Sequence, residues 1–243
     1  MALYKIVNYQ QALDFSPSDF LNDLQRYANT TIQLEIAKVS VNFSNHNFNS
    51  FNSFEKYLKA GNEICNAFIE YVHSSDNCTV EINNYILNYI SDEYRPTHLP
   101  LSIEISIDEK LISLNDATVL ADNLVQKYSF EYGYVHTLSS DKYFGETKIK
   151  KGLFSLSTME NENSLIWNQQ LHDIHRGFIK QLYYVNYLNQ SQAKNNSIRA
   201  CMESFGIYSR INDRITKWIL DKGNYESLRR NKDIINASIV KKT

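Results

Sequence analysis

The segment from residue 101 to residue 136 constrains the fold most, because it predicts a strand, a helix and a second strand in succession. LSIEISI at 101–107 alternates apolar and polar residues, as a half-buried strand does. Ser113 is a preferred N-cap residue, and apolar residues recur at helical spacing through 113–127. FEYGYVH at 130–136 predicts the second strand, with Phe130, Tyr132, Tyr134 and His136 on one face. The order strand, helix, strand is that of a βαβ-like unit.

The first part of the chain predicts a similar order of elements. A strand is expected at 31–43, a helix at 54–73 and a strand at 78–82. The alternation in the first of these strands changes phase at Ala37-Lys38, which predicts a β-bulge. Two further elements complete the prediction, a helix at 17–28 and a strand at 150–157.

These elements predict an α+β fold of mixed β-sheets with packed helices, arranged as two similar ferredoxin-like units in one compact body. RPTHLP at 95–100 holds two of the three prolines and marks an internal boundary. We therefore expect an N-terminal unit at 1–96 and a C-terminal unit at 97–243, either as two domains or within a single one. The second unit contains the tyrosine-rich segment.

Glycine and cysteine usage excludes several function classes. The seven glycines among 243 residues form none of the spacings that phosphate-binding loops and nucleophile turns need. The three scattered cysteines fit reduced thiols rather than a disulfide framework.

The net charge of −2 gives no indication of a nucleic-acid binder. The sequence shows neither a signal peptide nor an apolar run that could span a bilayer. We expect a cytoplasmic protein that binds no nucleic acid, membrane or cofactor.

The segment 164–176 predicts a short helix ending at Gly177, and it carries the best candidate for metal chemistry. His172 and His175 are three residues apart, so both imidazoles can point to one side, and Asp173 lies between them. A metal pair needs a third ligand, which the spacing does not supply. A helical histidine pair without a glutamate in the metalloprotease position is more typical of a surface or structural role. A metal-dependent hydrolase using these three residues is the alternative function.

GFIKQLYYVNYLN at 177–189 resembles the bacterial pattern Gly-x-Leu-Arg-Asp-Ile-Tyr-x-Val-Asn-x-Leu, with Lys180 and Gln181 in place of Arg-Asp. DRITKWIL at 213–220 looks like the closing strand of the same proteins. The resemblance is to the immunity proteins encoded beside bacterial polymorphic toxins, in the group called immunity protein 52, over roughly residues 165–220. The matching positions are Gly177, Leu182, Tyr183, Val185, Asn186 and Leu188.

This resemblance implies a cytoplasmic, non-enzymatic protein that binds and neutralises one cognate toxin. A tight inhibitor needs a central cluster of aromatic or charged anchors. Asn186 is more typical of a residue that bonds to the backbone, and we expect the face of Tyr183 and Val185 to be buried and Tyr184 to be accessible. A self-associating structural protein, with the tyrosine strands as its contact face, is a further alternative. The candidate toxin contacts are Tyr132, Tyr134, Trp167 and Tyr184, with Tyr183 and Tyr187 beside them.

Overall fold

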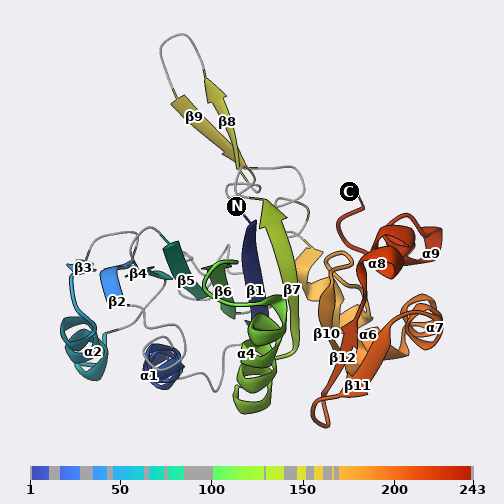
Figure 1. The fold of residues 1–243 in the computed structure, drawn as a ribbon, viewed down its shortest axis with the longest axis horizontal. Coiled ribbons are helices and arrows are strands. Elements are labelled where there is room, and N and C mark those ends of the chain that lie inside the picture. The colour runs from blue at the N-terminus through green and yellow to red at the C-terminus, as the bar shows by residue number, and fades with distance from the viewer. Residues whose placement is uncertain are drawn as a thin grey trace, which may run out of the picture. The chain divides into compact units, whose positions relative to one another are not determined.

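The fold is α+β, with antiparallel strand pairs and several helices (Figure 1). The chain divides into two compact units, Met1–Val135 and His136–Thr243. No helix in the described ranges is both long and apolar enough to cross a membrane. The computed structural model describes residues 2–10, 17–27, 35–42, 46–62, 66–73, 76–84, 101–128, 130–139, 147–151, 156–160, 166 and 170–241.

The first unit is built on a sheet with three helices. The helices are α1 (Pro17–Tyr27), α2 (Phe51–Lys59) and α4 (Leu114–Lys127), and all three lie on the same side of the sheet in Figure 1. β7 (Tyr132–Ser139) follows α4, neighbours β1 in the strand order, and continues into the second unit. The remaining strands, in their spatial order, are β1 (Ala2–Gln10), β6 (Leu101–Asp108), β5 (Asp76–Asn84), β4 (Asn66–His73), β2 (Glu35–Val41) and β3 (His46–Phe48).

A continuous row of aliphatic side chains crosses this sheet. Val39 pairs with Ile69, Ile69 with Val80, Val80 with Ile105, and Ile105 with Ile6. All of these side chains are completely buried. Burying one such aliphatic side chain contributes roughly 1.5–3 kcal/mol, so the row fixes the register of the strands that supply it.

Most predicted elements of the first unit are confirmed. The helix expected at 17–28 is α1, and the helix at 113–127 is α4, which opens with a capping box between Ser113 and Asp116. The strands expected at 78–82 and 101–107 are β5 and β6. The predicted bulge is present, because the pairing of β2 with β4 shifts between Ile36 and Lys38.

The helix predicted at 54–73 is wrong. α2 ends at Lys59, Gly61 adopts a left-handed conformation with φ of 78°, and residues 66–73 form β4. The apolar residues on the two sides of Gly61 mimic one long helical stripe. Within 66–73 the buried side chains alternate, which is the periodicity of a strand. They are Ala67, Ile69 and Tyr71.

The units divide at a different place from the predicted boundary. β6 follows that boundary in sequence, yet it pairs with β1 and β5, which precede it. The observed division falls after Val135. β1 was not among the predicted strands, and residues 85–100, which contain the proline pair, lie outside the described residues.

After the end of β7, the second unit holds a hairpin, three strands that lie next to β7 in the strand order, and short helices. The strand predicted at 150–157 spans the end of one hairpin strand and the start of the next, β8 (Thr147–Lys151) and β9 (Leu156–Glu160). In the sheet, β12 pairs antiparallel with β10 on one side and β11 on the other. The other elements are η4 (Leu171–Arg176), β10 (Val185–Asn189), α6 (Gln190–Lys194), α7 (Asn196–Ser204), β11 (Ile207–Arg210), β12 (Ile215–Ile219), α8 (Lys222–Leu228) and α9 (Lys232–Asn236).

The helix predicted at 164–176 is a 3-10 helix over its last part. η4 covers Leu171–Arg176, and Gly177 ends it in the left-handed conformation with φ of 92°, as the sequence indicated. Residues 167–169 lie outside the described part of the chain. Trp218 is completely buried in β12, which confirms its predicted place in the core.

Candidate functional site

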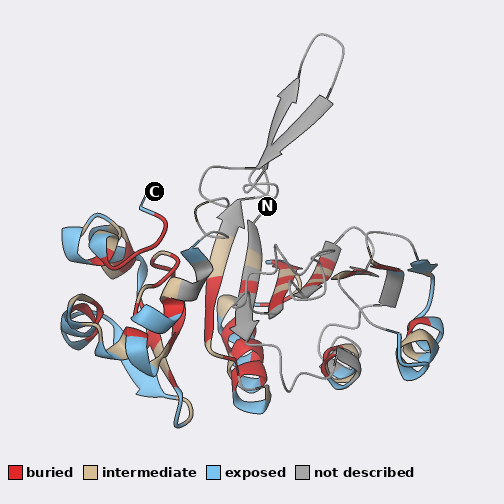
Figure 2. Ribbon diagram, turned by 180° about the vertical axis from the view of Figure 1, so that it is seen from behind, coloured by how far each residue is buried: buried red, intermediate tan, exposed pale blue. Residues whose placement is uncertain are grey.

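Among the strands of the second unit whose side chains are described, β11 is the most exposed, and it lies at the end of the strand order. It pairs with β12 on one side, and no described strand lies on its other side. All four of its residues are exposed, as Figure 2 shows. Ile207 is 72% exposed and Tyr208 is 51% exposed, the two highest values among the large hydrophobic side chains described. An open strand edge with exposed apolar side chains is a template for pairing with another polypeptide.

The backbone groups of β11 divide between β12 and the open edge. The Ile211 amide donates to the Ile215 carbonyl at 3.0 Å, just beyond the strand. Hydrogen-bonded residues alternate with non-bonded ones in an antiparallel pair. Ser209 therefore bonds to β12, whereas the main-chain groups of Tyr208 and Arg210 point away from β12 toward the open edge.

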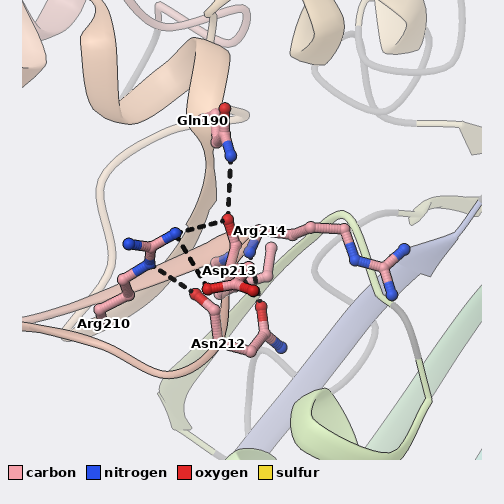
Figure 3. Close-up of polar contacts among 6 residues, drawn as sticks. Gln190, Arg210, Asn212, Asp213 and Arg214 are labelled. Carbon is pink, nitrogen blue, oxygen red and sulfur yellow. Dashed lines mark hydrogen bonds and ion pairs between the residues drawn. The ribbon is translucent and has the colours of Figure 1, made fainter.

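Asn212 fixes the turn that joins β11 to β12 (Figure 3). Its side-chain oxygen accepts hydrogen bonds from the backbone amides of Arg214 and Ile215, each at 2.9 Å. An asparagine side chain that bonds to the backbone two residues later mimics a backbone turn. The turn therefore holds its shape through a local contact that does not depend on any partner.

The Arg210 guanidinium is held against the same turn while it stays on the surface (Figure 3). Its Nε donates to the Asn212 carbonyl at 3.1 Å, and its Nη2 donates to the Asp213 carbonyl at 3.1 Å and lies 3.2 Å from the Asp213 carboxylate. Gln190 donates to the same Asp213 carbonyl at 2.9 Å. The Arg210 side chain remains 66% exposed. Holding it in place beforehand reduces the entropy lost on binding.

Tyr208 and Arg210 stand on one face of β11, because residues two apart in a strand point the same way. Tyrosine and arginine are the residue types enriched at the energetic centres of protein interfaces, together with tryptophan. The arrangement therefore supplies an aromatic anchor, a fixed cation and an open backbone edge within one short strand.

The start of β11 is held by contacts of the two preceding residues, Phe205 and Gly206, with β12. Gly206, with φ of 78°, links α7 to the strand, and a Cβ at this position would collide with the Ile219 carbonyl oxygen. The buried Trp218 indole donates to the Phe205 carbonyl at 2.8 Å. These contacts connect the exposed strand to the core of the unit, and a rigid support is what a precise binding surface requires.

Four of the tyrosines chosen from the sequence belong to the core, Tyr132, Tyr134, Tyr183 and Tyr187. Tyr132 is completely buried and Tyr134 is 3% exposed, with their rings 6.1 Å apart. Side chains buried in this way cannot serve as exposed contacts, which corrects the expectation placed on them. Trp167, the other distant candidate, lies outside the described residues.

Tyr184 is half-buried and forms part of an aromatic stack. Its ring lies 4.3 Å from that of Tyr225 with an interplanar angle of 28°, and 6.3 Å from the ring of His136. The Arg229 guanidinium lies over the Tyr225 ring, 5.8 Å from its centre. The neighbours of Tyr184 in the structure are therefore Tyr225 and His136, a contact that the sequence did not predict.

In the described part of the chain, the surroundings of the histidine pair of η4 do not form a metal site. His175 is exposed, and the Asp173 carboxylate accepts a hydrogen bond from Arg176 at 3.2 Å. The side chain of His172 lies outside the description. Among the described residues, no group of three or more histidines, cysteines or acids could hold a metal ion. The metal-dependent hydrolase stays a prediction.

The residues of β11 were missed by the sequence analysis, although a signal was present. IYSR and ITKWI are two short strand-like runs separated by INDR, a pattern that predicts a hairpin. What the pattern does not give is which of the two strands lies at the edge. That is decided by the pairing of β12 with β10.

Comparison with solved structures shows a likeness in fold. No family model matches this sequence, and no curated protein matches it significantly. A solved structure of the Pseudomonas aeruginosa type VI secretion system protein PA0821 is similar, with a TM-score of 0.57 and 10% sequence identity. The likeness covers 98% of this chain and 73% of that chain. At this identity it shows a shared fold.

Proposed function

We propose that this protein is a non-enzymatic inhibitor that binds a toxin protein and neutralises it, as an immunity protein does. The observation that carries the proposal is the open edge of β11, with Tyr208 exposed and the Arg210 head group held in place. Two further findings support it. The segment at 177–189 resembles immunity proteins, and the structural neighbour is a type VI secretion system protein.

Inhibition would follow from occupation of the toxin surface. A strand that docks through its backbone gives affinity, and its side chains give specificity. Such a protein needs no reacting group of its own. Inhibition of this kind requires only that the bound protein cover the active site of the toxin or another surface on which the toxin's activity depends.

The test is protection of bacteria that express the toxin encoded beside this gene. Co-expression of this protein should restore growth, and the two proteins should co-elute as a stable complex. The double variant Tyr208→Ala, Arg210→Ala should lose protection while its thermal unfolding stays unchanged. Val119→Ala, which removes an exposed apolar side chain from α4, should protect like the natural protein. If the natural protein neither protects nor binds, the proposal is wrong.

Self-association is a second candidate, since the same open edge can pair with another copy. Light scattering over a wide range of concentration distinguishes the two. Association of the purified protein alone, abolished by the double variant, would favour a structural role. A monomer at every concentration would exclude it.

A further inference from the structure

The two units carry opposite charges, although the whole chain is nearly neutral. The first unit has 8 Lys and Arg against 17 Asp and Glu, a net charge of −9. The second has 17 Lys and Arg against 10 Asp and Glu, a net charge of +7. The sum of these is the net −2 of the chain. The open edge of β11 belongs to the positive unit.

The local charges around the edge have the same sign. Between Ile207 and Ile219 the hairpin carries Arg210, Arg214 and Lys217 against the single acid Asp213. Asp213 is almost fully exposed and lies beside the Arg210 guanidinium. A surface of this sign attracts acidic partners and steers their approach.

The backbone of the same edge defines the kind of chain that fits. Tyr208 and Arg210 direct amide and carbonyl groups outward at the spacing of a strand, which an extended polypeptide can match with its own alternating donors and acceptors. A nucleic acid has no such series of groups. A second copy would bring two units of net charge +7 edge to edge, which like-charge repulsion opposes.

We propose that the edge of β11 accepts an acidic, extended segment of the toxin, which adds to the sheet of the second unit as a further strand. This proposal rests on the proposed function and names the chemistry of its partner. Tyr208 packs against the added strand and Arg210 pairs with a carboxylate on it.

The sign of the partner's charge is tested by Asp213→Asn. The change removes the acid that competes for Arg210 and keeps the backbone carbonyl to which Arg210 and Gln190 donate. Affinity for the purified toxin, measured by calorimetry, should rise roughly two- to fivefold, the range for an exposed ion pair. Weaker binding would mean that the docked segment is basic and would overturn the proposal.

A pair of charge-matched variants distinguishes a specific contact at Arg210 from a general effect of the positive charge of the unit on affinity. Arg210→Glu and Lys232→Glu change the net charge by the same amount, and Lys232 lies on the exposed surface of α9. Arg210→Glu should weaken binding by about tenfold or more, as loss of an interface anchor does. Lys232→Glu should weaken it by less than about threefold in physiological salt. Equal losses of affinity in the two variants would overturn the proposal that the toxin docks at Arg210.

Use of the backbone edge is tested by Tyr208→Pro against Tyr208→Ala. Both remove the ring, but only proline removes the outward amide, and it is tolerated on an edge strand. Proline should weaken binding by roughly a further fivefold, the loss of one hydrogen bond. Amide hydrogen exchange of the free protein should be fast at Tyr208 and Arg210 and slow at Ser209. Protection of the Tyr208 amide in the free protein would show that the edge is closed.

A synthetic probe makes the docking test independent of the toxin. A peptide of alternating glutamate and valine should shift the NMR signals of Tyr208 and Arg210, and a lysine–valine peptide should not. If the acidic peptide docks and the toxin does not bind, the docking surface stands and the proposed function fails. If the toxin binds while the peptide and the edge variants have no effect, the docking proposal fails alone. Binding of a poly-uridine oligonucleotide at the edge in place of the acidic peptide would also overturn it.

Discussion

The Asn186 side chain bonds in both directions with the main chain of Tyr183. The Tyr183 amide donates to Asn186 Oδ1 at 3.0 Å, and Asn186 Nδ2 donates to the Tyr183 carbonyl at 2.7 Å. Nδ2 also reaches the Trp218 carbonyl at 3.4 Å. Asn186 is only 1% exposed, so it satisfies backbone groups that water cannot reach. This agrees with the backbone-bonding role expected for it.

Replacing Asn186 by alanine should therefore destabilise the second unit strongly. The change removes both side-chain hydrogen bonds to the main chain of Tyr183 in a buried site, and the loss of each such bond costs roughly 1–3 kcal/mol. We expect a loss of about 2 kcal/mol or more in a urea melt, and a similar or larger loss for Asn186→Asp. Asn224→Ala, which removes an exposed contact with Asp221, should change stability by less than about 0.5 kcal/mol. Comparable losses at the two positions would contradict the role of Asn186.

Gly206 and Gly61 make a matched pair, because both have φ of 78°. An alanine at either position is strained by roughly 1–3 kcal/mol in the left-handed region. At Gly61 the added methyl group meets nothing within 4 Å, whereas at Gly206 it meets the backbone of β12. Thermal melts should show a clearly larger loss for Gly206→Ala than for Gly61→Ala. Equal losses would mean that the strand moves away without cost.

Asp23 connects α1 to the end of α4 and should give the first unit an acid-sensitive contact. Its carboxylate accepts hydrogen bonds from Lys127 and Tyr128. Burial of the Asp23 carboxyl raises its pKa, but the two hydrogen bonds together with the positive charges of Lys127 and Arg26 outweigh burial, so the pKa lies below the ordinary 3.8. The stabilisation is fully present above pH 3.8 and is lost as the pH falls through the lower folded value.

Asp23→Asn should lower stability at neutral pH and reduce its decline below about pH 4. Urea melts over a pH series measure both effects. Glu55→Gln, which breaks an i,i+4 pair with Lys59 on α2, should leave the profile close to that of the natural protein. An unchanged acid limb in Asp23→Asn would show that other carboxylates control it.

Replacing Tyr183 by alanine should lower the free energy of unfolding more than replacing Tyr184 does. Tyr183 and Val185 are buried, as expected, so Tyr183→Ala should cost roughly 3–5 kcal/mol through the cavity that it leaves. Tyr184→Ala should cost about 1 kcal/mol rather than almost nothing, because its ring stacks on Tyr225. A loss below 0.5 kcal/mol would indicate that the stack contributes no stability.

Tyr71 offers a change that should stabilise the protein. Its ring is completely buried opposite Cys78, and its hydroxyl has no hydrogen-bond partner among the described residues. Burial raises the pKa of this hydroxyl, so it stays neutral. Tyr71→Phe should raise the free energy of unfolding by about 1 kcal/mol, because the buried polar group is removed. A clear loss would reveal a partner for the hydroxyl.

Local signals predicted the parts of the fold that depend on neighbouring residues. Ser113 begins α4, Gly177 ends η4, and the change of phase at Ala37 marks the bulge, each through a backbone requirement written in one or two residues. The helix predicted at 54–73 failed because apolar spacing was followed across Gly61. The left-handed conformation of that glycine separates α2 from β4.

The candidate site could not be predicted in the same way. The alternation of β11 and β12 is similar, yet Ile207 is exposed and Ile215 is buried. The difference comes from the place of each strand in the sheet, which depends on pairing with β10 across more than twenty residues of sequence. Tyr132 and Tyr134 show the reverse case, since their residue type suggested an interface and their strand places them in the core.

The bulge in β2 also determines where the length of this chain can vary. Ile36 and Lys38 pair with Tyr71 and Glu70, which are adjacent in sequence, so Ala37 is the one residue of β2 without an opposite partner. Deleting Ala37 would leave a regular ladder, whereas deleting Val39 or Ser40 would shift the following residues to the opposite face of the sheet. Homologues of this protein should therefore tolerate a single-residue gap at Ala37 and at no other position within the strand.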